Sequence, residues 1–167
     1  MTTINVKNIG FSRPRPTTKG YNVLVNYSNK KTVTIDTGEV MCPYGVDKSS
    51  SDVSMKLNVN DTLRSILESI DELNVTLPER LGWFEDDVEP FYFTPFQQNN
   101  TLRVKIPLTR SGALDVEVLT ADDDTLSTIG DIVPGSKLRC TLEWKNVWII
   151  DETYGYFWTV KQIEILN

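Results

Sequence analysis

The chain of 167 residues (19.0 kDa) is 40% apolar and 24% charged with a formal net charge of -6. These values are typical of one globular domain and argue against a protein that coats nucleic acid with its whole surface. The absence of histidine excludes Ser-His-Asp and Cys-His catalysis, histidine zinc sites and a histidine general base. Two cysteines, Cys42 and Cys140, cannot form a four-cysteine metal site, so we expect no metal and no cofactor.

The first 60 residues are the basic part of the chain. They carry eight basic and four acidic side chains, against two and nine in residues 61–100 and seven and ten in residues 101–167. The segment FSRPRPTTKG (residues 11–20) has two prolines and three cations, which predicts an extended basic arm over residues 1–20. Such a region attracts an anionic ligand, or it is an arm kept soluble by its charges.

The beginning of the chain also bears on its location. MTTINVKNIG lacks the apolar core of a signal peptide, and no later run approaches the about 18 apolar residues of a membrane helix. We therefore expect an intracellular protein that is neither secreted nor inserted in a membrane.

Strand patterns follow the arm. Apolar and polar residues alternate over residues 21–27, and after the polar turn SNKK a second run covers residues 32–35, which predicts a β-hairpin. The segment VMCPYGV (residues 40–46) contains a proline and a glycine and predicts a structured loop. Alternation over residues 53–59 predicts a further strand.

One helix and one irregular segment occupy residues 61–100. Apolar residues recur at helical spacing after Asp61, which predicts a helix over residues 62–74 with Asp61 as its N-cap. Residues 77–96 contain three prolines and many acidic side chains without a clean period, so we interpret them as an insertion loop. We expect four aromatic side chains to pack this loop against the domain: Trp83, Phe84, Phe91 and Phe93.

The next two runs, residues 102–106 and 114–118, alternate on either side of the turn-like TRSG. They predict a second hairpin, in which Arg103 and Lys105 face acidic partners across the strands. We therefore expect these two cations to be neutralised by two acids of the opposite strand, Asp115 and Glu117.

Two long segments rich in β-branched and aromatic residues, 137–150 and 156–165, predict two terminal strands. The total is seven or eight short antiparallel strands, one helix and a long aromatic and acidic insertion. This pattern predicts a mainly β single domain over residues 1–167, either an OB-like barrel or a β-sandwich.

Patterns for catalysis are weak. Asp131, Glu143 and Lys145 occur in the order of a metal-dependent nuclease site, but a Glu and a Lys two residues apart on a strand are common. The acidic triplet at residues 122–124 lacks the spaced oxygens and the glycine of a calcium loop. The GSK at residues 135–137 lacks the glycine spacing of a phosphate loop. We therefore expect a protein that is not an enzyme.

Aromatic residues beside cations favour recognition of single-stranded nucleic acid, in which bases stack on rings while Lys and Arg contact phosphates. The alternative is that most of these aromatics belong to the core of a β-domain. We expect six cations to contact phosphates, namely Lys19, Lys30, Lys31, Lys137, Arg139 and Lys145. We expect four aromatics to stack on bases, namely Tyr21, Tyr27, Trp148 and Tyr156.

Three segments carry a family resemblance: TGEVMCPYGV (residues 37–46), GSKLRCTLEWKNVWII (135–150) and YGYFWTVKQIEI (154–165). They resemble proteins of nucleocytoplasmic large DNA viruses, which are similar to the single-stranded DNA-binding proteins of short-tailed phages. The resemblance implies an OB-type five-stranded barrel that binds single-stranded DNA without sequence preference during genome replication in the host cell. It also implies self-association or contacts with replication proteins such as the polymerase.

One difference favours another hypothesis. The similar proteins end in an acidic tail with a terminal aromatic, whereas this chain ends at Asn167, directly after the last predicted strand. Together with the acidic sequence pI of ≈ 4.7, this favours a β-rich viral structural protein, present in the virion. In that case residues 77–96 dock on a capsid or scaffold protein, and no nucleic acid is bound.

Overall fold

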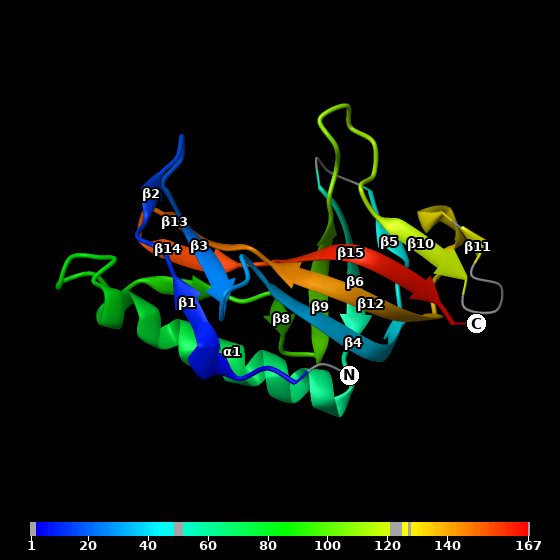
Figure 1. Ribbon diagram of the computed structural model, residues 1–167, viewed down its shortest axis with the longest axis horizontal. Coiled ribbons are helices and arrows are strands. Elements are labelled where there is room, and N and C mark those ends of the chain that lie inside the picture. Colours follow the sequence, from blue (N-terminus) through cyan, green and yellow to red (C-terminus); the bar gives the residue numbers. More distant parts are fainter. Residues whose placement is uncertain (1–2, 49–51, 121–124, 127, 167) are drawn as a thin grey trace.

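The structure is a computed structural model that describes residues 3–48, 52–120, 125–126 and 128–166 (Figure 1). Within these residues, five strands close into a barrel: β4 (Val33–Cys42), β6 (Val53–Asn58), β9 (Thr101–Ile106), β15 (Trp158–Ile165) and β12 (Ser136–Trp144). Neighbouring strands are antiparallel except β9 and β15, whose parallel pairing closes the barrel. This is an OB-like barrel, which confirms one of the two predicted architectures.

The barrel interior follows from the alternation along each strand. On β12, Leu138, Cys140, Leu142 and Trp144 are buried, whereas Lys137 and Arg139, which alternate with them, are exposed. Side chains of a strand alternate between faces, so the apolar series fills the barrel and the polar series lies outside. The other barrel strands contribute Val33, Ile35, Met55, Leu57, Leu102, Val104, Trp158 and Val160 to the same core.

A second sheet extends from the barrel. It comprises β1 (Ile9–Phe11), β2 (Arg15–Pro16), β3 (Tyr21–Tyr27), β13 (Asn146–Ile150), β14 (Thr153–Tyr156) and β7 (Phe91–Phe93). The two predicted terminal strands are each divided, at Lys145 and at Phe157, so that β13 and β14 form a hairpin between barrel strands β12 and β15. The predicted basic arm is only partly extended, because residues 6–8 form a 3-10 helix; its two strands, β1 and β2, both pair with β3.

Helix α1 (Asp61–Leu81) connects barrel strands β6 and β9 and is longer than the predicted residues 62–74. Its N-cap is Asn60 rather than Asp61, because the Asn60 side chain accepts a hydrogen bond from the backbone N–H of Leu63 at 2.8 Å. Pro78 does not end the helix. The carbonyl of Asn74, which proline cannot bond, accepts a hydrogen bond from the Tyr154 hydroxyl at 3.0 Å. Figure 1 shows α1 beneath the second sheet.

The predicted hairpin of residues 102–118 is wrong. The 107–116 turn forms, but β9 pairs with β6 and β15, whereas β10 (Glu117–Thr120) pairs in parallel with another part of β15. The two strands diverge because each pairs with a different part of the barrel sheet. Arg103 and Lys105 therefore lie opposite β6 rather than opposite the predicted acids.

The remaining elements are short: η1 (Val6–Asn8), β5 (Val46–Asp47), β8 (Phe96–Gln97), β11 (Thr125–Leu126) and η2 (Ile129–Asp131). The predicted insertion loop is irregular over residues 82–90, and then supplies strands β7 and β8. No helix among the described residues is long and apolar enough to cross a membrane.

Candidate nucleic-acid interface

A groove crosses the outer face of the barrel beside the β13–β14 hairpin. Its largest hollow, ≈ 330 Å³, lies between aromatic residues of the second sheet and two cations of β9, Arg103 and Lys105. Adjoining hollows of ≈ 240 and ≈ 250 Å³ share Lys105 and Arg103, respectively, with the first. We call this continuous surface the aromatic groove, and its main residues are Tyr44, Lys56, Phe93, Arg103, Lys105, Trp148 and Phe157. The groove lies over β6 and β9, which are the second and third barrel strands along the chain. It also includes the loop after β4, the first strand, and the β13–β14 hairpin after β12, the fourth. This is the surface on which OB-folds bind oligonucleotides.

Two rings of the second sheet form one wall of the groove. In the strand register Trp148 lies opposite Gly155, and Gly155 opposite Phe93, so all three share one face of the sheet. The Trp148 and Phe93 rings are 5.7 Å apart between centroids and inclined by 38°. Gly155 permits this approach, because a Cβ there would lie 2.7 Å from the Trp148 ring and 2.5 Å from the Phe93 carbonyl oxygen. Phe93 and its neighbour Phe91 are 49% and 61% exposed.

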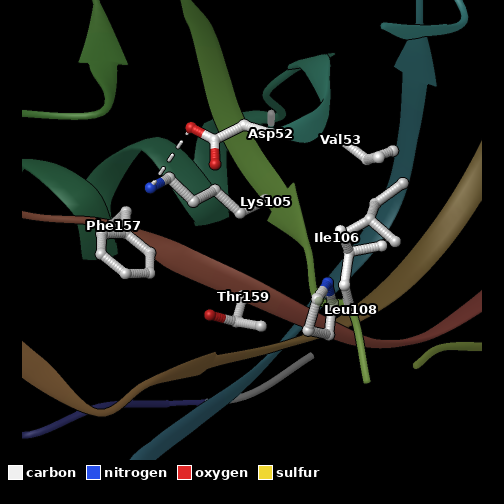
Figure 2. A pocket seen from close by; sticks show the side chains of 8 residues that line it. Asp52, Val53, Lys105, Ile106, Leu108, Phe157 and Thr159 are labelled. Carbon is white, nitrogen blue, oxygen red and sulfur yellow. Dashed lines mark ion pairs between the residues drawn. The ribbon is translucent and has the colours of Figure 1, made fainter. Parts of the chain in front are cut away.

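The barrel side of the groove combines an aromatic ring with two cations. The Lys105 ammonium lies 4.1 Å from the centre of the Phe157 ring, a cation–π contact. The Asp52 carboxylate is 3.7 Å from the same ammonium and 3.9 Å from Arg103. Figure 2 shows Asp52 and Phe157 on either side of the Lys105 side-chain end. Two cations thus share this one acid at distances beyond hydrogen bonding, which leaves positive charge beside the ring.

Helix α1 holds the strand that carries Phe93. The Asp71 carboxylate accepts hydrogen bonds from the Tyr92 hydroxyl at 2.6 Å and from the Thr94 hydroxyl at 2.8 and 3.0 Å. Asn74 donates to the Tyr92 hydroxyl at 3.0 Å. Burial raises the pKa of Asp71 and raises that of Tyr92 far above the usual value, so the tyrosine remains a hydrogen-bond donor. Because Tyr92 and Thr94 flank Phe93, these bonds set the position of its ring.

A basic cluster lies beside the groove. Glu143 is buried and lies 3.1 Å from the Lys145 ammonium and 3.4 Å from that of Lys161, and it accepts a hydrogen bond from the Thr32 hydroxyl. Burial raises the pKa of Glu143, but the hydrogen bond and the charge of Lys145, with the charge of Lys161, bring it below its ordinary value. The strand register places Thr159 between Glu143 and Lys105, so this cluster continues the positive surface of the groove.

The ten predicted contact residues do not form one site. Trp148 lines the groove and Lys145 belongs to the basic cluster. Lys30 and Lys31 are exposed in the β3–β4 turn, which leads to Thr32 of the cluster. Lys19 is exposed between β2 and β3.

Four predicted residues lie elsewhere. Tyr21 is opposite Ile149, so its ring is on the other face of the sheet from Trp148. The Tyr27 hydroxyl accepts a hydrogen bond from the backbone N–H of Asn5. Lys137 and Arg139 do not line the groove, and Arg139 bonds the carboxylate of Asp36 through two nitrogens.

The prediction that Tyr156 stacks on bases is wrong. Its side chain is 3% exposed, and its ring packs against Trp144 and Trp158 at centroid distances of 4.7 and 5.9 Å. The prediction that Phe91 and Phe93 pack the insertion against the domain is also wrong, because both are exposed and only Phe93 lines the groove. Sequence reasoning had set aside Arg103 and Lys105 as neutralised, and it missed the role of Phe157 in the groove.

The described residues contain no group of three His, Cys, Asp or Glu side chains able to hold a metal ion. Asp131, the first residue of the nuclease pattern, accepts a hydrogen bond from the backbone N–H of Thr128 in η2. The acidic triplet of residues 122–124 lies outside the described residues. Cys42 and Cys140 are buried free thiols, and burial raises the pKa of both.

No protein-family model matches the chain, and no curated protein matches it. Among solved structures, it is similar to gp2.5, a single-stranded DNA-binding protein encoded by bacteriophage T7, with a TM-score of 0.57 and 10% identity over 81% of this chain and 87% of that one. It is also similar to the single-stranded DNA-binding protein of bacteriophage Enc34, with a TM-score of 0.52 and 15% identity over 91% and 87% of the two chains. The chain therefore has the fold of these two phage proteins.

Proposed function

We propose that the protein binds single-stranded DNA without sequence preference, in the aromatic groove, during the replication of a viral or phage genome. The observation that carries this proposal is the groove itself, in which the rings of Phe93, Trp148 and Phe157 lie beside Arg103 and Lys105. The fold shared with two phage single-stranded DNA-binding proteins supports it.

The groove has the two components that such binding needs. Bases stack on the exposed ring of Phe93 and the partly exposed rings of Trp148 and Phe157, at about 1–3 kcal/mol for each base, and any base can do so because every base has a flat π-face. Phosphates follow the cations of β6 and β9 toward Lys145 and Lys161, and their counterions are released. This arrangement requires no catalysis, so we propose a binding protein rather than an enzyme.

The viral setting is part of the same proposal. The resemblance to proteins of nucleocytoplasmic large DNA viruses supports action inside a host cell beside replication proteins. The alternative of a capsid-associated protein without nucleic-acid binding is not favoured, because it gives no role to exposed rings flanked by cations on the face where OB-folds bind oligonucleotides.

Titration of tryptophan fluorescence with a thymine oligonucleotide of about 30 nucleotides, at low and moderate salt, tests the proposal. Trp144 and Trp158 are fully buried, and Trp83 packs on Tyr154 on the other face of the second sheet, so quenching reports mainly on Trp148. We expect saturable quenching that weakens steeply with salt. The variant Trp148→Phe should lose most of the quenching while a mobility shift still detects binding.

A matched pair of charge reversals tests where the DNA lies. The variant Arg103→Glu should weaken binding at least tenfold and reduce the salt slope by about one or more. The control Arg80→Glu changes the same charge at the end of α1, outside the groove, and should change the affinity less than threefold. Equal losses in both variants, or no saturable binding by the wild type at low salt, would contradict the proposal.

A further inference from the structure

A further hollow, separate from the aromatic groove, lies on the other side of the second sheet, between the end of α1 and residues 82–90. It is the largest of the hollows described, at ≈ 520 Å³, and its size falls within the range of pockets that bind ligands. Tyr92 and Tyr154 belong to it, and their hydroxyls bond α1, so it opens on the face opposite Phe93 and Trp148. In Figure 1 this segment curls beyond the end of α1.

The hollow combines an apolar floor with an acidic rim. The floor is formed by Pro78, Phe84, Val88, Tyr92 and Tyr154. Four carboxylates line the rim, Glu79, Glu85, Asp86 and Glu89, and no cation lines the hollow. None of these four acids belongs to an ion pair within the described part of the chain, although Lys and Arg pair with four other acids there.

The walls are held in place without a ligand. Gly82 ends α1 with a φ of 66°, and the backbone N–H of Trp83 donates to the Pro78 carbonyl at 3.0 Å. The rings of Trp83 and Phe84 then pack on Tyr154 at centroid distances of 5.9 and 6.2 Å. Preformed walls reduce the entropy cost of ordering the protein when a ligand of complementary charge binds.

We propose that this acidic hollow docks a basic peptide segment of a partner protein, with one bulky apolar side chain on the floor and Lys or Arg side chains along the rim. Charge complementarity identifies the occupant, because four unpaired acids spread over residues 79–89 match several cations spaced along a peptide. DNA is excluded by like charge. Because the hollow and the aromatic groove occupy opposite faces of the same sheet, the peptide and single-stranded DNA can bind together.

Fluorescence anisotropy of a labelled KKRWKRK peptide, titrated without DNA, tests this docking. The rim variant Glu85→Lys with Glu89→Lys should weaken peptide binding at least tenfold. The control Glu39→Lys with Glu72→Lys makes the same charge change at exposed acids outside the hollow and should weaken it less than threefold. A peptide with serine in place of tryptophan should bind the wild type about tenfold more weakly, because the anchor is lost.

Circular dichroism and thermal unfolding establish that each variant is folded before its affinity is read. Equal losses in the rim and control variants would overturn the proposal, since they would mean general charge attraction. Equal affinity for the serine peptide would overturn it too. Sedimentation could show that the wild type dimerises and that the rim variant does not. That result would overturn the partner peptide and identify the occupant as a second copy of the chain.

Discussion

Gly155 offers a sharp test of base stacking, because its replacement by alanine changes shape without changing charge. A Cβ at this position would lie 2.5 Å from the Phe93 carbonyl oxygen, 3.0 Å from the Phe93 Cβ and 2.7 Å from the Trp148 ring. The backbone contact cannot be relieved by a rotamer change, so β7 must move from β14 and the two rings must separate. Overpacking of this kind costs about 1–3 kcal/mol of folding free energy.

The effect on binding follows from the same geometry. If the wall formed by Trp148 and Phe93 stacks at least one base, Gly155→Ala should lose about 1–3 kcal/mol of binding free energy, a 5- to 150-fold rise in Kd. The slope of log Kd against log salt should stay unchanged, because no phosphate contact is lost. Titrations with a thymine oligonucleotide at several salt concentrations measure both quantities.

A methyl group added elsewhere provides the control for this prediction. At Gly130 in η2 the nearest atom to an added Cβ is the Thr128 hydroxyl oxygen at 3.4 Å, so Gly130→Ala should leave Kd within twofold. A Gly155→Ala protein that is destabilised yet binds DNA with wild-type affinity would refute the role of this wall. A reduced salt slope would refute the separation of stacking from phosphate contacts.

Three further variants each remove one carboxylate. Asp71→Asn removes the anionic acceptor of Tyr92, which should lower the free energy of unfolding by about 1.5–3 kcal/mol and weaken DNA binding at unchanged salt slope. Denaturant titration measures the stability, and DNA titration measures the affinity. Unaltered affinity would contradict the link between α1 and Phe93. Asp52→Asn removes the acid beside two groove cations and should tighten DNA binding by about two- to fivefold with a steeper salt slope; weaker binding in the titration would count against the placement of DNA. The pKa of Asp36 is lowered by the hydrogen bond from Arg139, so the native state gains stability above the unfolded pKa and loses it as the pH falls through the lower folded pKa. Asp36→Asn should therefore be less stable by about 0.5–1 kcal/mol at pH 7, with a difference that shrinks below pH 3.8, the ordinary value, in thermal unfolding measured against pH.

Alternation located the barrel strands because their inner faces are continuous apolar surfaces. The predicted hairpin of residues 21–35 is nevertheless wrong, because β3 and β4 lie in different sheets. The predicted loop of residues 40–46 is also partly wrong, because β4 continues to Cys42. It did not show that residues 137–150 form two strands in different sheets, since both halves have the same β-rich composition. The change at Lys145 is set by how the two sheets pack together. Helix spacing likewise located the start of α1. The helix continues past Pro78 because the Asn74 carbonyl, which proline cannot bond, accepts a hydrogen bond from Tyr154, a residue distant in sequence.

The candidate site was harder to predict than the fold. Arg103 and Lys105 were expected to be neutralised because the nearest strand in sequence carries two acids. The strand topology separates these cations from those acids, because β10 pairs with β15 instead of β9. Burial is equally invisible in a run such as YGYFW, where Tyr156 is buried in the core while Phe157 is partly exposed beside Lys105. The reason is that one residue of offset in a strand changes the face on which a ring lies.

The helix between the second and third barrel strands explains how exposed rings remain in place. Large aromatic side chains on a free sheet edge would collapse onto apolar neighbours or associate with other chains. Here α1 covers one face of β14 and β7 and bonds Tyr92 and Tyr154, which fixes the strands from behind. Phe93 and Trp148 are thereby held open on the other face, with Gly155 between them. A ring that is already positioned loses little entropy when a base stacks on it, so binding in the groove depends on contacts made on the opposite face of the same sheet.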